Sequence, residues 1–236
     1  EVDVAVTSTS DRLEALLNKA ATSPVNVHDI EQFYPYELDG FQVEATELLL
    51  RGSSVVVSAP TGSGKTLVGE TAILTALARG EKAIYTTPLK ALSNQKLREF
   101  QKIFGKRRCG LKTGDVDING DADVMIMTTE ILRNMLYSSA AGGRDDERLA
   151  DVSIIVLDEV HYLADRSRGT VWEETIIYCP SRIQLLCLSA TVGNPEDLSG
   201  WIEEVHGECE TVVSSYRPVP LTWQYSMKPS RMYPGL

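Results

Sequence analysis

Two segments of this chain carry side chains that together could hydrolyse a nucleoside triphosphate. The first is residues 59–66, Ala-Pro-Thr-Gly-Ser-Gly-Lys-Thr, which directly follow the apolar run 55–57. A glycine-rich turn between a strand and a helix points backbone N–H groups and the positive helix end at one place, which suits a polyphosphate. Lys65 would reach the β- and γ-phosphates and Thr66 would hold Mg²⁺. This segment therefore predicts a triphosphate site.

The second segment is Asp158-Glu159-Val160-His161, directly after the apolar run 154–157. Asp158 would hold the metal, partly through water, and Glu159 would orient the water that attacks the γ-phosphorus. Each segment alone is ambiguous, because a glycine turn is a common strand-to-helix connection and acids often end a strand. The usual phosphate-loop pattern also has glycine at position 59, where this chain has Ala59. The two segments together indicate ATPase chemistry.

Both segments need a scaffold that brings the two strand ends together. Apolar runs predict strands at 54–58, 83–87, 108–112, 124–128, 152–158, 183–189 and 210–214. Helical patterns predict helices at 11–20, 65–79, 89–104, 129–137, 171–178 and 195–206, and residues 138–151 form a polar insertion. Near-continuous apolar strands are typical of a parallel sheet covered on both faces, with ligands beyond the carboxyl ends of the strands. We therefore expect an α/β fold with a mostly parallel sheet and helices on both faces.

Composition limits the setting of this fold. The chain has 236 residues, enough for one large α/β domain or two small ones, and no apolar window of about 18 residues that would span a membrane. Its cysteines contain no C-x-x-C pair and lie in or beside apolar strands, which favours reduced core residues and a reducing compartment. They are Cys109, Cys179, Cys187 and Cys209.

The charge distribution leaves a nucleic-acid partner open. The net charge of −10 argues against one, because affinity for a polyphosphate rests on Lys and Arg. Residues 89–112, however, hold eight basic side chains against the single acid Glu99. A solvated helix face would explain the same cluster.

The order of several further segments resembles that of superfamily 2 helicases. They are 37–42, 86–95, 113–115, 127–136, 158–161, 171–174, 189–191 and 217–221. Over about residues 29–225 the chain resembles the first RecA-like domain of a Ski-family DExH-box RNA helicase, most closely the branch with plant chloroplast members. Ala59 is normal in that family. The resemblance implies a RecA-like P-loop NTPase domain at 29–222, after an N-terminal helical extension at 1–28 and before the start of a linker at 223–236.

The resemblance also assigns roles to individual residues. For ATP binding it implies Gln42, Ala59, Pro60, Thr61, Gly62, Ser63, Gly64, Lys65 and Thr66, with Lys65, Asp158 and Glu159 catalytic and Mg²⁺ held by Thr66 and Asp158. Coupling of the nucleotide to the nucleic acid falls to His161, Ser189 and Thr191. RNA-backbone contacts fall to Pro88, Leu89, Lys90, Thr113, Gly114, Thr128, Thr129 and Arg133. His28 and His206 are expected at the surface or at helix caps.

The function that the resemblance implies is ATP-dependent unwinding or remodelling of RNA. A DNA helicase of the related repair branch and an ATP-binding scaffold without turnover are the alternatives. Residues 127–136 and 171–174 resemble the RNA branch more than the DNA branch, and the intact phosphate loop and acid pair argue against a scaffold. The chain holds no Gln-x-x-Gly-Arg-x-Gly-Arg run, so the arginine fingers would come from a second RecA-like domain outside it.

Partners and location follow from the same resemblance. The expected substrate is single-stranded RNA or an RNA duplex with an overhang, and no membrane is expected to take part. The expected location is the chloroplast, with nucleus or cytoplasm as alternatives, and the protein is expected to be soluble.

Overall fold

The computed structural model describes residues 8–142, 145–164, 169–191 and 193–220. Its strands are β1 (Ser54–Ser58), β2 (Lys82–Thr87), β3 (Cys109–Lys112), β4 (Asp117–Ile118), β5 (Val124–Thr128), β6 (Val152–Asp158), β7 (Gln184–Ser189) and β8 (Cys209–Val213). Its α-helices are α1 (Thr9–Ala20), α2 (Val27–Glu31), α3 (Gly40–Arg51), α4 (Lys65–Ala78), α5 (Lys90–Ile103), α6 (Thr129–Ala140), α7 (Asp145–Leu149), α8 (Gly169–Tyr178) and α9 (Pro195–Val205). A 3₁₀ helix, η1 (Val160–Ala164), follows β6.

The strands form one sheet in the order β4-β3-β5-β2-β6-β7-β1-β8. All neighbouring pairs run parallel except β3 and β4 at one edge. Every residue of β1, β5 and β7 is buried, as expected for strands covered on both faces. The carboxyl ends of β1 and β6 lie on either side of β7, which brings the two chemical segments to one edge of the sheet.

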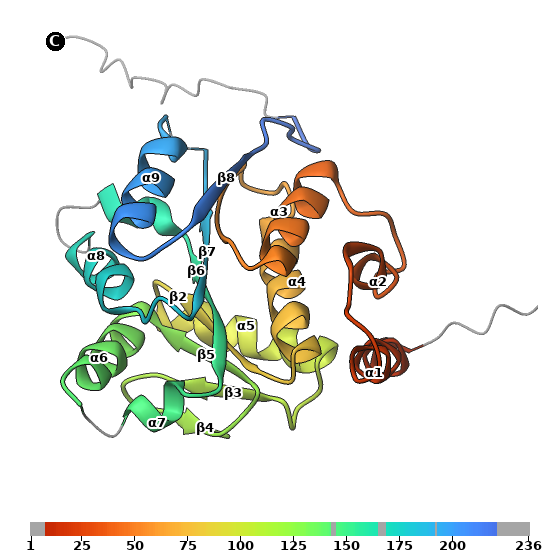
Figure 1. Cartoon of the computed structure of the whole chain (residues 1–236), viewed down its shortest axis with the longest axis horizontal. Coiled ribbons are helices and arrows are strands. Elements are labelled where there is room, and N and C mark those ends of the chain that lie inside the picture. The colour runs from red at the N-terminus through yellow and green to blue at the C-terminus, as the bar shows by residue number, and fades with distance from the viewer. Residues whose placement is uncertain (1–7, 143–144, 165–168, 192, 221–236) are drawn as a thin grey trace, which may run out of the picture.

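Helices cover both faces of this sheet (Figure 1). On one face α3, α4 and α5 pack against a core that includes Leu49, Leu74 and Phe100. On the other face α6, α8 and α9 pack against a core that includes Leu136 and Trp172. The predicted fold class, a mostly parallel sheet with helices on both faces, is confirmed.

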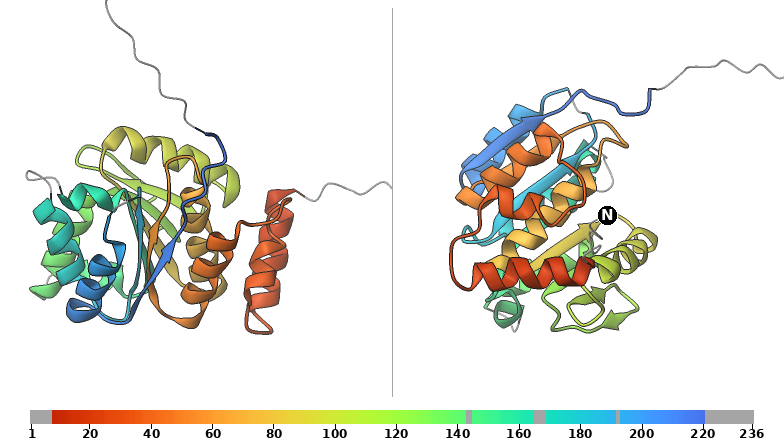
Figure 2. Two further views of the ribbon diagram at one scale, coloured as in Figure 1. Left: turned by 90° about the horizontal axis from the view of Figure 1, so that it is seen from above. Right: turned by 90° about the vertical axis from the view of Figure 1, so that its right-hand side faces the viewer.

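The helix α1 lies outside the α3–α4 layer (Figure 2). Its Leu13 and Leu16 are buried and belong to the same core as α4. The helix α1 therefore packs on this layer through an apolar stripe. Residues 1–7 of the predicted N-terminal extension and the predicted linker start at 223–236 lie outside the described residues.

The predicted strands agree with the structure to within one residue at each end. The helix α3 was not predicted, although Asp39 and Gln42 form a capping box at its start and Gly52, with φ 105°, ends it. The prediction of a polar insertion at 138–151 was wrong in part, because α6 continues to Ala140 and α7 buries Leu149 in the core.

No helix of the described residues is long and apolar enough to cross a membrane. The four cysteines are free, as predicted. Burial raises the pKa of the Cys109 and Cys179 thiols to about 12, so both stay protonated at neutral pH.

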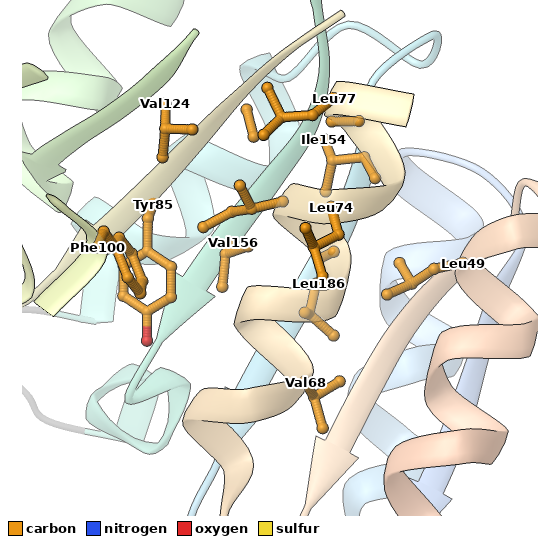
Figure 3. Packing of buried hydrophobic residues seen from close by; sticks show 14 of the residues in the cluster. Leu49, Val68, Leu74, Leu77, Tyr85, Phe100, Val124, Ile154, Val156 and Leu186 are labelled. Carbon is orange, nitrogen blue, oxygen red and sulfur yellow. The ribbon is translucent and has the colours of Figure 1, made fainter. Parts of the chain in front are cut away.

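The core under α4 also positions a polar group. Figure 3 shows Tyr85 of β2 beside Phe100 of α5, with the Tyr85 hydroxyl at the edge of the apolar cluster. The two rings meet edge to face, with centroids 5.0 Å apart. The ring is thereby locked while its hydroxyl stays available for a polar partner.

Candidate functional site

The phosphate loop joins the buried strand β1 to the helix α4. Gly62 and Gly64 have φ values of 84° and 89°, a left-handed conformation that only glycine adopts without strain. Gly64 is the N-cap of α4, so the helix begins directly at Lys65. The backbone N–H groups of the first helical turn thus face the loop, as an anion site requires.

Lys65 folds back over this loop. Its Nζ donates to the carbonyl oxygens of Ala59 at 2.7 Å and Pro60 at 2.9 Å. Burial lowers the pKa of Lys65, while the charges of Glu159 and Asp158 act in the opposite direction. The ammonium group is therefore held at the mouth of the loop by backbone carbonyls and neighbouring acids.

The two acids lie at the end of β6. The Tyr85 hydroxyl donates to Asp158 Oδ2 at 2.7 Å, and the backbone N–H of Glu159 donates to Asp158 Oδ1 at 3.0 Å. Burial raises the pKa of Asp158, the Tyr85 hydrogen bond lowers it and the Glu159 charge raises it again. The carboxylate is half-buried and is fixed by one donor on each oxygen.

Glu159 has an unusual backbone conformation. Its φ of 61° is left-handed, which costs free energy for a residue with a side chain. Such strain clusters at functional sites, where the surrounding fold holds it. The Glu159 carboxylate reaches His161, with Oε2 3.3 Å from Nδ1.

The phosphate loop and the acids line one cavity of about 450 Å³. Its lining residues are Thr61, Gly62, Gly64, Lys65, Thr66, Thr87, Leu92, Gln95, Lys96, Asp158 and Glu159. The Thr66 hydroxyl and the Asp158 carboxylate are oxygen donors of the kind Mg²⁺ prefers. Mg²⁺ is commonly bound through one or two protein oxygens together with phosphate and water oxygens, and this donor set fits that mode.

Gln42 lies against the phosphate loop from α3. Its Nε2 donates to Gly64 O at 3.2 Å, and its Oε1 accepts from the Asp39 N–H at 2.8 Å. A Cβ at Gly64 would lie 2.6 Å from Gln42 Nε2, so the Gln42 amide would have to move, and the φ value of 89° itself favours glycine there. The amide is committed to protein backbone, and selection of adenine by Gln42 stays a prediction.

His161 lies between the acids and the segment 189–191. Its Nδ1 is 3.3 Å from Glu159 Oε2 and 3.5 Å from the backbone nitrogen of Ala190. The Ala59 N–H donates to Ser189 O at 3.2 Å, which joins the phosphate loop to the same segment. The Ser189 hydroxyl is buried without a hydrogen-bond partner, and Thr191 is exposed.

The predicted RNA-contacting residues come together at the carboxyl edge of β2, β3 and β5. Thr87 and Thr128 are register partners at the ends of β2 and β5. Among the predicted RNA-contacting residues, Leu89, Lys90 and Gly114 are exposed and Arg133 is half-buried. The remaining four are buried: Pro88, Thr113, Thr128 and Thr129. Contacts from this edge would therefore come mainly from backbone groups.

Arg133 does not point the same way as Thr129. Its Nη1 pairs with Glu174 Oε2 at 3.2 Å, which links α6 to α8, whereas the Thr129 hydroxyl lies 3.5 Å from Thr87 O in the core. Contact with RNA by Arg133 and by Thr129 stays a prediction.

Three residues of the site had no predicted role. Tyr85 holds Asp158, Lys96 Nζ lies 3.3 Å from Thr66 Oγ1, and Glu70 lies one turn after Thr66 with a pKa that burial raises to about 7. Glu70 could have been suspected, since a residue four positions after Thr66 shares its helix face. The roles of Tyr85 and Lys96 depend on contacts between distant segments, which the sequence does not display.

His206 is the C-cap residue of α9, as the expectation of a surface or cap position allowed, and it is buried. Its ring nitrogens lie 3.2 Å from Cys179 O and 2.8 Å from Ile183 O. The ring therefore ties the end of α9 to the turn before β7.

Comparisons with known proteins agree with this arrangement. Residues 39–198 match the family described as DEAD/DEAH box helicase. The chain is 56% identical over 220 residues to the DExH-box ATP-dependent RNA helicase DExH15, chloroplastic, of Arabidopsis thaliana, covering 93% of this chain and 19% of that protein. It is 47% identical over 205 residues to the antiviral helicase SKI2 of Saccharomyces cerevisiae, covering 82% of this chain and 16% of that protein.

Among solved structures, the DUF1998 helicase MrfA bound to DNA superposes with a TM-score of 0.64. The match covers 87% of this chain and 29% of that chain at 22% sequence identity, so it supports the fold alone. The chain spans less than a fifth of the length of the two curated relatives.

Proposed function

The chain belongs to the DEAD/DEAH box helicase family, and on this premise we propose that it is the first RecA-like, ATP-binding domain of an ATP-dependent RNA helicase. The observation that carries the proposal is the cavity shared by Lys65, Thr66, Asp158 and Glu159. A phosphate loop, a hydroxyl and two adjacent carboxylates are groups that phosphoanhydride hydrolysis uses.

Each of these groups would have a separate task. Lys65 would exchange its two carbonyl partners for phosphate oxygens, a short movement because both carbonyls belong to the loop itself. Thr66 and Asp158 would hold Mg²⁺, Asp158 partly through water, and Tyr85 keeps the carboxylate in place. Bound Mg²⁺ would supply positive charge to the phosphate oxygens. Glu159 would orient the attacking water and accept its proton.

Coupling to the nucleic acid would run through the segment 189–191. Ser189 contacts the phosphate loop through its backbone, and His161 lies between Glu159 and Ala190. A change at the γ-phosphate would therefore reach this segment by two routes. One runs from the phosphate loop to Ser189, and the other runs from Glu159 through His161 to Ala190. We place Gln42, Thr191 and the remaining loop residues 59–64 in the roles that the family resemblance implies.

RNA is the proposed substrate because a relative that is 56% identical over 93% of this chain is named as an ATP-dependent RNA helicase. The edge formed by the ends of β2, β3 and β5 would bind the sugar-phosphate backbone of a single strand or an overhang without reading bases. We propose domain limits of 29–222, with a helical extension at 1–28, a linker starting at 223–236 and a second RecA-like domain as partner. A chloroplast location is proposed from the relative named chloroplastic.

The test is ATP hydrolysis by the full-length protein that carries this chain, with single-stranded RNA and DNA of matched sequence. RNA should stimulate turnover more strongly than DNA, and Lys65→Ala should abolish it with both. Equal or greater stimulation by DNA would support a DNA helicase instead. Nucleotide binding without turnover under any condition would support a scaffold.

A further inference from the structure

Lys96 lies at the metal-binding side of the nucleotide cavity. It belongs to α5, yet its Nζ is 3.3 Å from Oγ1 of Thr66, in the first turn of α4. Its side chain is only 14% exposed. The same ammonium group donates to Glu99 Oε2 at 3.0 Å and lies 5.9 Å from the centroid of the Tyr85 ring. A long cation thus reaches from one helix to the hydroxyl proposed to bind Mg²⁺.

The surroundings of this ammonium group are acidic. Its charge lowers the pKa of both Asp158 and Glu70 against the rise caused by their burial. Glu99 and Glu159 also line or border the same space. The other lysine that lines the cavity, Lys65, is bonded to the loop carbonyls instead. Lys96 is therefore the cation placed at Thr66.

We propose that Lys96 is a tethered cation that holds the Mg²⁺ position of the nucleotide-free site and competes with Mg²⁺ for the Thr66 hydroxyl. The proposal rests on the proposed function, since it presumes that this cavity binds nucleotide with Mg²⁺. A magnesium ion on the Thr66 oxygen would lie about 2.1 Å from it. The ammonium group at its present position would then be within a few ångströms of a divalent cation, and the two would repel.

If Mg²⁺ displaced Lys96 from Thr66, the lysine would still have a second partner. Glu99 lies one helical turn further along α5 and already accepts from Nζ. Binding of Mg²⁺ with nucleotide would shift the lysine fully to Glu99, away from Thr66. Lys96 is thus a positioning residue that sets how much Mg²⁺ the site needs.

The experiment measures the affinity of the full-length protein for a fluorescent ADP as a function of Mg²⁺ concentration. Lys96→Met removes the charge, so the Mg²⁺ concentration that gives half-maximal ADP binding should fall by about tenfold. Lys96→Arg keeps a charge and should stay near the wild-type value. Lys102→Met, at an exposed lysine of the same helix, is the matched control and should also match the wild type.

The outcomes distinguish a failure of the role proposed for Lys96 from a failure of the proposed nucleotide-binding function. An unchanged or higher Mg²⁺ requirement in Lys96→Met overturns the role of Lys96 while leaving nucleotide binding intact. Absence of Mg²⁺-dependent ADP binding in the wild type overturns the proposed function itself. If circular dichroism shows Lys96→Met unfolded, Lys96→Gln replaces it, because the amide can still donate to Thr66 without a charge and should give the same fall.

Discussion

Glu70 makes the stability of the nucleotide pocket depend on pH. Burial raises its pKa to about 7, from an ordinary value of 4.5, and the charge of Lys96 only partly opposes this. The folded protein therefore keeps a proton on Glu70 that the unfolded chain loses above pH 4.5. Because the folded state binds more protons between pH 4.5 and about 7, the free energy of unfolding must fall as pH rises through that window.

The magnitude follows from the two pKa values. A difference of one pH unit corresponds to about 1.4 kcal/mol, so Glu70 lowers the free energy of unfolding by about 3 kcal/mol at pH 8 relative to pH 4. Glu70→Gln keeps the shape of the side chain but cannot ionise. The variant should match the wild type at pH 4 and be more stable by up to about 3 kcal/mol at pH 8.

Urea unfolding of both proteins at a series of pH values from 4 to 8 measures this difference. Glu44→Gln, at an exposed glutamate of α3, is the control and should track the wild type throughout. Parallel curves for the wild type and Glu70→Gln would refute the reasoning, because they would mean that Glu70 ionises alike in the folded and unfolded states.

Three further predictions concern the site and its rim. Tyr85→Phe removes the donor to Asp158, a hydrogen bond to a charged group worth about 1.5–3 kcal/mol, so calorimetry should show weaker Mg²⁺-dependent nucleotide binding. Gly64→Ala puts a side chain at φ 89°, so it should cost about 1–3 kcal/mol in urea unfolding and abolish nucleotide binding. Arg133→Ala should weaken RNA binding and reduce the salt slope by about 0.7, whereas Glu174→Ala should leave RNA affinity intact. Wild-type RNA affinity and salt slope in Arg133→Ala would assign Arg133 to helix packing alone.

Most of the fold could be predicted from local patterns in the sequence. The apolar runs before Ala59 and Asp158 mark buried parallel strands, and the polar residues after them mark the strand ends where such sheets bind ligands. The helix α3 shows the limit, because Asp39 and Gln42 cap it while Gln42 also resembles a nucleotide contact. Gln42 is thus compatible both with a helix cap and with a nucleotide contact, and the structure shows the cap.

Contacts between distant segments could not be predicted in the same way. The Tyr85 hydroxyl meets Asp158 only because β2 and β6 are neighbours in a particular register. Lys96 meets Thr66 only because α5 packs beside α4 over the same face of the sheet. Such pairs depend on register and helix packing, which no local spacing in the sequence determines.

The central claim, that Asp158 and Glu159 form an ATPase site with the phosphate loop, is tested most directly by Glu159→Gln in the full-length protein. Single-turnover hydrolysis of bound ATP with saturating RNA should fall by about a hundredfold or more, since the amide cannot accept the proton of the attacking water. ATP affinity should stay close to that of the wild type, because Lys65, Thr66 and Asp158 are unchanged. Hydrolysis near the wild-type rate with unchanged affinity would contradict the account.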